Sequence, residues 1–236
     1  MRFGLALGSL ALLMLCGLLA PAGAAAQIYD EITPHRDFSS PEHFALEVRV
    51  GPYQPDMGGN KAFTTFFGTD HGPMFAFELD VVAYRLKDVL YLNGGAGMGT
   101  ASYLGHTLDA TGLPTAEKTT LSMLPINLLA VLRVDVLARK LSVPFIFAGK
   151  IGYQWAHWNA QDGKAAPVSG WSVGMRWAAQ VALDLDAFDQ KAARRMDEEW
   201  GINHSLLFFE LFQFKPSPRS LPLGSTAWTV GLGFSF

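Results

Sequence analysis

The chain ends in Trp228-Thr229-Val230-Gly231-Leu232-Gly233-Phe234-Ser235-Phe236, and its residues alternate between two kinds. The even positions are large and apolar, whereas the odd positions are small and mostly polar. A period of two is typical of a β-strand with one apolar face. At the open edge of a soluble sheet such a strand would promote aggregation. In a barrel closed within lipid, the last strand pairs with the first and its apolar face contacts acyl chains. The stretch therefore predicts a transmembrane β-barrel.

The same ending has a second meaning. Gly231, Phe234 and Phe236 stand in the order Gly-x-x-Phe-x-Phe. This order resembles the carboxy-terminal signal by which the assembly machinery recognises outer-membrane barrels. We therefore expect that machinery to be a partner during biogenesis. Outer-membrane lipid is the expected partner of the finished barrel.

The amino-terminal segment is typical of a secretory signal. Arg2 supplies a positive charge, residues 5–20 supply an apolar core, and Ala24-Ala25-Ala26 supply a small-residue cleavage site. The only cysteine, Cys16, lies inside this segment, so the mature chain is expected to carry no thiol. A lipoprotein signal at Cys16 is the weaker alternative, because Leu15 is large where a small residue is needed. The predicted divisions are a signal peptide at 1–26, a periplasmic lead at 27–42 and a barrel at 43–236.

The bulk composition excludes several classes of function. The net charge is −3, and no basic stripe is present, so nucleic acid is not an expected partner. Beyond the signal, no apolar run reaches the roughly 18 residues that a spanning helix needs. The longest candidate, at 119–132, contains Pro125 and Asn127. A secreted soluble protein and a β-barrel are the two classes left, and periodicity favours the barrel.

Seven further segments alternate as the last one does. We predict an all-β fold, a transmembrane antiparallel up-and-down β-barrel of about eight strands. The strands before the last are predicted at 43–53, 74–85, 89–103, 119–138, 143–158, 171–184 and 204–215. Long loops are predicted at 54–72, 105–118, 159–170 and 216–224. Tight turns are predicted at 87–88 and 139–142. An even number of strands with alternating long and short connections is typical of bacterial outer-membrane barrels.

The period changes between the sixth and seventh strands. Phe188, Ala192, Met196 and Trp200 recur every four residues, which predicts a short periplasmic helix before strand seven. An aspartate at 186 or 189 can cap its start, and Gly201 can end it.

Several segments together resemble a known family. The residues that carry the resemblance are 183–189, Ala192-Ala193-Arg194, Met196-Asp197 and 201–210, with Phe44 to Tyr53, Pro55-Asp56, Glu78-Leu79-Asp80 and the stretch from Pro125 through Arg133 and Asp135. They look like a family of outer-membrane β-barrel proteins found in myxobacteria and relatives. The resemblance covers most of the mature chain and implies its fold and location. It implies no catalytic residue.

Ten charged residues fall on the faces predicted to point into the barrel. They are Glu47, Arg49, Glu78, Asp80, Arg133, Asp135, Lys150, Arg176, Asp184 and Glu210. An eight-stranded barrel is just wide enough for side chains to fill it. We therefore predict a network of paired charges that plugs the lumen. A narrow ion or proton path is the alternative. The inward glycines Gly95, Gly97 and Gly99 are expected to leave room for large side chains.

Other chemistries have weaker support. The six histidines are scattered without helical metal-ligand spacing, so no metal site or other cofactor is predicted. A lipid-modifying enzyme would need serine, histidine and a carboxylate at one rim. His157 with Ser169 or Ser172 is the best arrangement that the strand assignment offers. Aromatic residues at the strand ends, among them Tyr53 and Tyr103, suggest two interfacial girdles.

The sequence therefore predicts an integral outer-membrane barrel with a structural or surface-binding role. We expect a monomer that is not an enzyme, with a possible surface partner at its external loops. A small pore is the second hypothesis, and a lipid-modifying barrel enzyme is the third.

Overall fold

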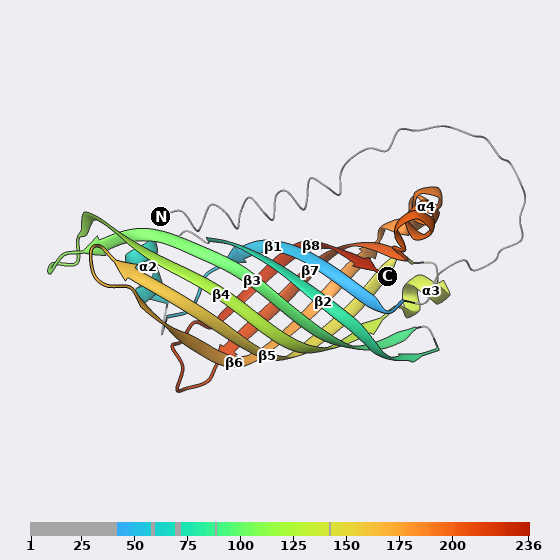
Figure 1. Ribbon diagram of the computed structural model, residues 1–236, viewed down its shortest axis with the longest axis horizontal. Helices are drawn as coiled ribbons and strands as arrows, with labels where there is room; N and C mark the ends of the chain where they lie inside the picture. Colours follow the sequence, from blue (N-terminus) through green and yellow to red (C-terminus); the bar gives the residue numbers. More distant parts are fainter. Residues whose placement is uncertain (1–41, 58–59, 69–71, 88, 142) are drawn as a thin grey trace, which may run out of the picture. The chain divides into compact units, whose positions relative to one another are not determined.

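The computed structural model describes residues 42–57, 60–68, 72–87, 89–141 and 143–236 (Figure 1). The predicted signal peptide and all but the last residue of the predicted lead lie outside the described residues. Among the described residues, no helix is both long and apolar enough to cross a membrane.

Eight strands close into a single barrel (Figure 1). Each strand pairs antiparallel with its neighbours in sequence, and the last pairs with the first. Their bounds are β1 (Phe44–Tyr53), β2 (Gly72–Leu86), β3 (Leu90–Leu108), β4 (Pro114–Val134), β5 (Phe145–Asp162), β6 (Val168–Asp184), β7 (His204–Pro216) and β8 (Ser225–Ser235). The predicted all-β, up-and-down antiparallel barrel is confirmed.

The alternating carboxy-terminal strand is what closes the sheet. β8 pairs with β1 through Leu46↔Phe234 and Val48↔Leu232. The seam is continued by the last residue, because the Phe236 carbonyl accepts hydrogen bonds from the backbone N–H groups of His43 and Phe44. All strand edges along the seam are therefore satisfied, as a barrel requires in a medium without water.

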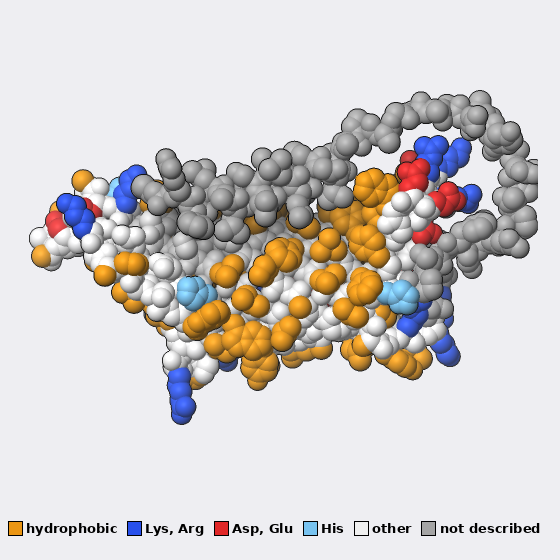
Figure 2. All heavy atoms as spheres, viewed as in Figure 1, with side chains coloured by type: hydrophobic (Ala, Val, Ile, Leu, Met, Phe, Trp, Pro, Cys, Tyr) orange, Lys and Arg blue, Asp and Glu red, His pale blue; other side chains and the backbone are white. Residues whose placement is uncertain are grey.

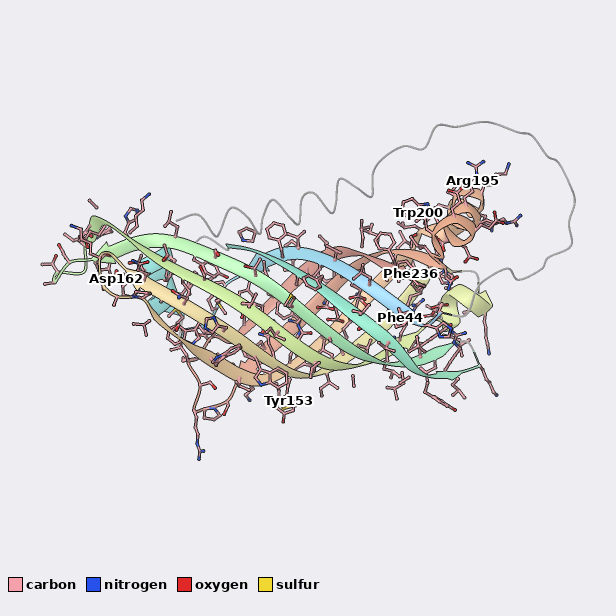
Figure 3. All side chains as sticks on the ribbon, viewed as in Figure 1. Phe44, Tyr153, Asp162, Arg195, Trp200 and Phe236 are labelled. Atoms are coloured by element: carbon pink, nitrogen blue, oxygen red, sulfur yellow. The ribbon has the colours of Figure 1, made fainter. Side chains whose placement is uncertain are left out.

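The outer wall is apolar, and the middle of the inner face carries buried charges, which is the reverse of a soluble protein. Outward side chains such as Phe75, Leu128 and Tyr153 are more than half exposed. Figure 2 shows orange apolar side chains spread over the barrel wall, and Figure 3 shows Tyr153 pointing away from it. A contiguous apolar surface of this kind is unfavourable in water and favourable in lipid.

Both chain ends of the barrel lie at one end of it. We call this the terminal end, and we call the opposite end, which carries the β1–β2 connection, the loop end. Figure 1 shows one short helix, α2, at the loop end and two others, α3 and α4, at the terminal end.

Two of the predicted long loops are mostly strand. β3 continues to Leu108 and β4 begins at Pro114, so the predicted loop at 105–118 is reduced to a turn. The predicted loop at 159–170 is likewise reduced by the longer β5 and β6. A strand that extends into water can carry polar residues on both faces. Its sequence then shows no alternation of apolar and polar residues, so it is not recognised as a strand. The extension is hydrogen-bonded: Thr107 of β3 donates to Asp162 of β5 at 2.6 Å, near the loop end (Figure 3).

The turn that replaces the first of these loops is organised by one carboxylate. Asp109 accepts hydrogen bonds from the Thr111 hydroxyl at 2.6 Å and from the Leu113 backbone at 2.9 Å. These bonds stabilise the charged form and lower the pKa of Asp109 below its ordinary value.

Two connections that are predicted to have no helix each contain a short one. The first loop, predicted at 54–72, includes α2 (Asn60–Phe67). The turn predicted at 139–142 is replaced by α3 (Val136–Leu141), because β4 already ends at Val134. Both helices are short, with 8 residues in α2 and 6 in α3, so neither shows a clear helical period in the sequence.

The helix before strand seven is confirmed. A turn of 3-10 helix, η1 (Leu185–Ala187), precedes α4 (Gln190–Trp200). Of the two predicted caps, Asp189 caps α4 by accepting hydrogen bonds from the backbone of Lys191 and Ala192. Gly201 ends the helix in the left-handed conformation, with φ 68°. Arg195 and Trp200 of this helix are labelled in Figure 3.

Replacing the helix-ending glycine should loosen α4 without unfolding the barrel. A Cβ at Gly201 is disfavoured at positive φ by about 1 kcal/mol, so Gly201→Ala should raise hydrogen exchange of the α4 amides about fivefold. Gly149→Ala is the matched control, because a Cβ there meets no atom within 4 Å and φ is ordinary. Equal exchange in the two variants would show that the cap does not stabilise α4.

Candidate functional site

The inside of the barrel has three layers of different chemistry. An apolar layer lies toward the loop end, a charged layer lies in the middle, and a mixed layer lies toward the terminal end.

The loop-end layer is built around aromatic rings. Phe63 and Phe67 of α2 pack against Tyr103, with ring centroids 5.0 and 6.1 Å apart. The Tyr103 hydroxyl donates to the Tyr53 carbonyl at 2.7 Å, and the Tyr53 ring stacks on Phe212. Tyr53 and Tyr103 are therefore interior residues, and their predicted place in an interfacial girdle is wrong. A tyrosine can bury its ring when its hydroxyl finds a partner, as both do here.

The central layer is organised by Lys150. Its side chain comes from β5, on the opposite wall from β1, and is fully buried. Its ammonium lies 2.6 Å from Glu47 of β1, 2.7 Å from Glu78 of β2 and 3.3 Å from Glu210 of β7. One cation thus holds three carboxylates from three strands, and the contact spans the lumen.

Two arginines complete the charge balance. Arg49 lies 2.5 Å from both Glu47 and Glu210 and 3.1 Å from Glu78. Arg176 lies 3.0 Å from Glu210. The cluster therefore has three carboxylates and three cations, and we call these six residues the central cluster: Glu47, Arg49, Glu78, Lys150, Arg176 and Glu210.

Neutral groups and rings add further contacts to the cluster. Gln154 accepts a hydrogen bond from Arg176 at 3.1 Å, and Gln180 donates to Glu47 at 3.0 Å. The Arg176 guanidinium also lies 4.2 Å from the centre of the Phe212 ring. A buried ion pair is tolerated only when its remaining polar groups are bonded in this way.

The other four predicted lumen charges lie apart from this cluster. Arg133 pairs with Asp135 at 2.8 Å near the terminal end, and Asp184 lies beside His204. Asp135 follows β4 instead of lying within it, contrary to the predicted strand. Asp80 is buried but makes no ion pair among the described residues. The structure thus brings six of the ten residues into one cluster.

Asp80 depends on a glycine for its position. A Cβ added at Gly95 would collide with the Asp80 carboxylate, and one at Gly97 would lie 2.9 Å from the Asn127 side chain. These inward glycines therefore leave room for polar side chains of the neighbouring strands, as expected. Beside them lies a cavity of about 20 Å³, lined by Glu47, Asp80 and other residues, which is about the size of a single water.

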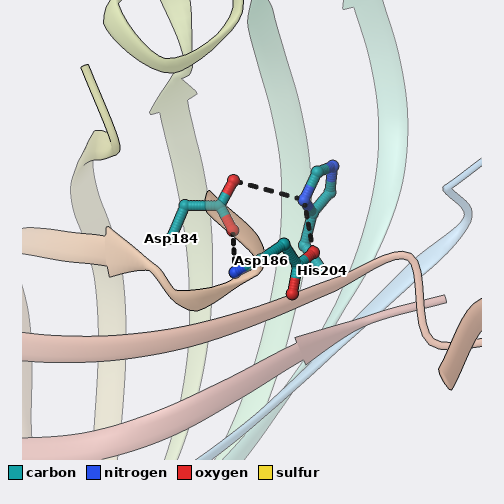
Figure 4. A group of neighbouring side chains, drawn as sticks. All are labelled: Asp184, Asp186 and His204. Carbon is teal, nitrogen blue, oxygen red and sulfur yellow. Dashed lines mark hydrogen bonds and ion pairs between the residues drawn. The ribbon is translucent and has the colours of Figure 1, made fainter. Parts of the chain in front are cut away.

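The terminal-end layer includes a group that the sequence analysis missed. Asp184, Asp186 and His204 converge there (Figure 4). His204 Nε2 also lies 3.6 Å from Glu42. The chain separates the aspartates from the histidine by a helix, and only the pairing of β6 with β7 brings them together. Their spacing in the sequence therefore gives no signal.

The hypothetical rim triad is not assembled among the described residues. Ser169 lies on the same face of β6 as Trp171, which pairs with His157, but no hydrogen bond joins Ser169 to His157. Ser172 is fully buried and donates to the Leu221 carbonyl at 2.7 Å. His157 is on the outer face, where its ring packs against Trp171 with centroids 5.0 Å apart. The two residues lie on opposite faces of the wall, so they cannot share a proton.

A groove of about 800 Å³ opens at the loop end beside the β7–β8 connection. Its lining includes Gln213, Lys215, Ser217, Ser220 and Trp228. On the barrel wall next to it, Trp177 donates to Gln213 at 2.9 Å and Gln213 donates to Thr226 at 3.1 Å. This groove has the mixed polar and aromatic lining of a surface that could contact a ligand.

Comparison with known proteins adds little beyond the fold. No protein-family model and no curated protein matches the sequence, so the resemblance to a myxobacterial family stays a prediction. The solved structures that it resembles include Ail, the attachment invasion locus protein of Yersinia pestis, at 8% identity over 83% of this chain and 97% of Ail, with a TM-score of 0.43. Neisserial surface protein A is 9% identical over 83% of this chain and 97% of its own, with a TM-score of 0.44. The outer-membrane protease OmpT of Escherichia coli is 7% identical over 83% of this chain and 94% of its own, with a TM-score of 0.38. Proteins with such different descriptions, at such low similarity, transfer no activity to this chain.

Removing one carboxylate of the central cluster should destabilise the barrel strongly. Glu210→Ala would leave Arg49, Lys150 and Arg176 with a surplus buried charge, at a cost of about 3–5 kcal/mol in the free energy of unfolding. Urea unfolding of the protein refolded in lipid vesicles measures this. The exposed Glu117→Ala is the control and should change little. An equally small effect of both substitutions would contradict the assignment of the cluster as a structural element.

Proposed function

We propose that this protein is an integral barrel of a bacterial outer membrane whose lumen is plugged by its own side chains. Its role is structural or surface-binding, in envelope integrity or adhesion, and not conduction or catalysis. The observation that carries the proposal is the Lys150-centred cluster, whose contacts reach from one wall of the barrel to the other.

The membrane location is supported by the outer wall. Large apolar side chains are exposed around the barrel, and the backbone hydrogen bonds of the sheet close on themselves. Both properties are what a bilayer demands of a spanning segment. With the terminal end in the periplasm, as in bacterial barrels, α3 and α4 would be periplasmic and α2 would be external.

The plugged state is supported by all three layers. Phe63 and Phe67 fill the loop end, six charges fill the middle, and the pairs around Arg133 lie toward the terminal end. An ion crossing the barrel would have to break contacts that are already matched in charge. The groove beside Lys215 and Trp228 supports a surface-binding role, because it is open to the outside at the loop end.

Conductance distinguishes the plugged barrel from the pore. The full chain is refolded, its folding is verified by the gel mobility of boiled and unboiled samples, and it is inserted into a planar bilayer. The proposal predicts no single-channel steps. Lys150→Ala should admit water to the centre and produce intermittent leak, because it removes the cation that joins three strands. Lys164→Ala, in the exposed β5–β6 turn, is the control and should remain silent.

The outcome that would overturn the proposal is equally specific. Steady single-channel steps from the folded wild-type chain, altered in size by Lys150→Ala but not by Lys164→Ala, would show a conducting lumen. The small pore would then replace the plugged barrel as the function.

A further inference from the structure

Asp184, Asp186 and His204 direct one atom each toward a common point (Figure 4). His204 Nδ1 lies 3.1 Å from one oxygen of Asp186 and 3.4 Å from one oxygen of Asp184. The three ligand atoms all lie within 4.8 Å of one another. A tetrahedral zinc ion with bonds of about 2.0–2.2 Å keeps its ligand atoms about 3.3–3.6 Å apart. The two separations from His204 Nδ1 are close to those of such a site.

The two carboxylates are oriented by bonds outside this group. Asp184 accepts a hydrogen bond from the Asp186 backbone at 3.2 Å through one oxygen and faces His204 with the other. Asp186 does the same, accepting from the Ser205 backbone at 3.3 Å. The fold thus holds one oxygen of each aspartate toward His204.

The histidine nitrogen lies within ion-pair distance of both carboxylate oxygens. His204 Nδ1 is buried, yet it makes no hydrogen bond. It is close enough to both carboxylates to bind one metal ion together with them. It is not aligned for a hydrogen bond to either. The three atoms therefore surround one point, where a cation could take the place of the histidine proton.

The far side of the ring has the support that a metal-binding histidine usually has. Nε2 lies 3.6 Å from Glu42, which also contacts Arg133 at 3.4 Å. Histidine ligands commonly direct their second N–H toward a carboxylate, which fixes the ring orientation and raises its basicity. Glu42 is the carboxylate nearest to Nε2, at ion-pair distance.

We propose that Asp184, Asp186 and His204 bind a divalent transition-metal ion, of which Zn²⁺ fits best, at the terminal end of the barrel. One nitrogen and two carboxylate oxygens suit Zn²⁺ better than Mg²⁺ or Ca²⁺, which prefer oxygen alone and more ligands. The side chains are 12, 18 and 22% exposed, so a water or an incoming ligand has access to a fourth position. The ion would fasten η1 to the start of β7. This inference is independent of whether the lumen conducts.

Zinc titration of the folded full chain tests the site. Isothermal titration calorimetry with ZnCl₂ near neutral pH should give one strong site per chain. His204→Ala and Asp186→Asn should each weaken binding by about a hundredfold or more, and Glu42→Gln should weaken it by about ten- to hundredfold. His106→Ala is the matched control, because His106 is exposed at the loop end and should leave the affinity unchanged.

Cobalt supplies a readout that depends on the ligands themselves. Co²⁺ bound in place of Zn²⁺ should give the intense visible absorption of a four-coordinate ion, and His204→Ala should abolish it. Gel mobility of every variant verifies that the barrel is folded. Two results would overturn the proposal: a folded wild-type chain that gives no zinc heat, or zinc binding that His204→Ala leaves unchanged.

Discussion

The contacts of Lys150 are the constraint on which the rest of the barrel depends. Three glutamates from three strands would repel one another inside a narrow lumen. The Lys150 ammonium lies within 3.3 Å of all three and reaches them from the opposite wall. Arg49 and Arg176 bring the sum of charges to zero. The cluster is stable only if all its members are present and correctly placed, so it favours one strand register over the others.

The same contacts explain the distribution of residues on the two faces. The outer face carries large apolar side chains, which lipid solvates, so it contributes little to specifying the register. The inner face carries charges with few acceptable partners, and a slip of one residue would turn Glu47 and Arg49 outward. Inward glycines fit this arrangement, because the volume beside Gly95 and Gly97 is taken by Asp80 and Asn127. The inward-facing residues therefore determine the strand register, and the outward-facing residues provide the affinity for lipid.

The sequence predicts the walls of this barrel better than its interior contacts. Which residues face inward follows from a period of two, so Glu47, Lys150 and Glu210 were assigned to the correct face. Which of them meet does not follow, because contact between β5 and β1 depends on closure and tilt. Asp80 was grouped with the charges that it does not join. The Asp184, Asp186 and His204 group was missed because β6–β7 pairing, and not sequence spacing, assembles it.

The ends of the barrel were predicted least well, for a physical reason. In water a strand has no apolar face to reveal it, so the extensions of β3 to β6 resembled loops. α2 is only two turns long, and its Phe63 and Phe67 show their role only when Tyr103 is found beside them. The helix α4 was found because its stripe runs over three turns. An element could thus be predicted when its pattern was long and when its apolar and polar faces differed clearly.

Access of water to the central cluster tests the plugged barrel most directly. Thr229 is fully buried and pairs with Glu210 across the β7–β8 ladder. Its hydroxyl makes no hydrogen bond, so Thr229→Cys removes none. In the full chain with Cys16→Ser, a water-soluble methanethiosulfonate reagent should leave this thiol unmodified in the folded barrel. It should modify the thiol completely in urea, and should modify Ser169→Cys at the exposed loop end without urea. Rapid modification of Thr229→Cys in the folded barrel would contradict a lumen closed by its own charges.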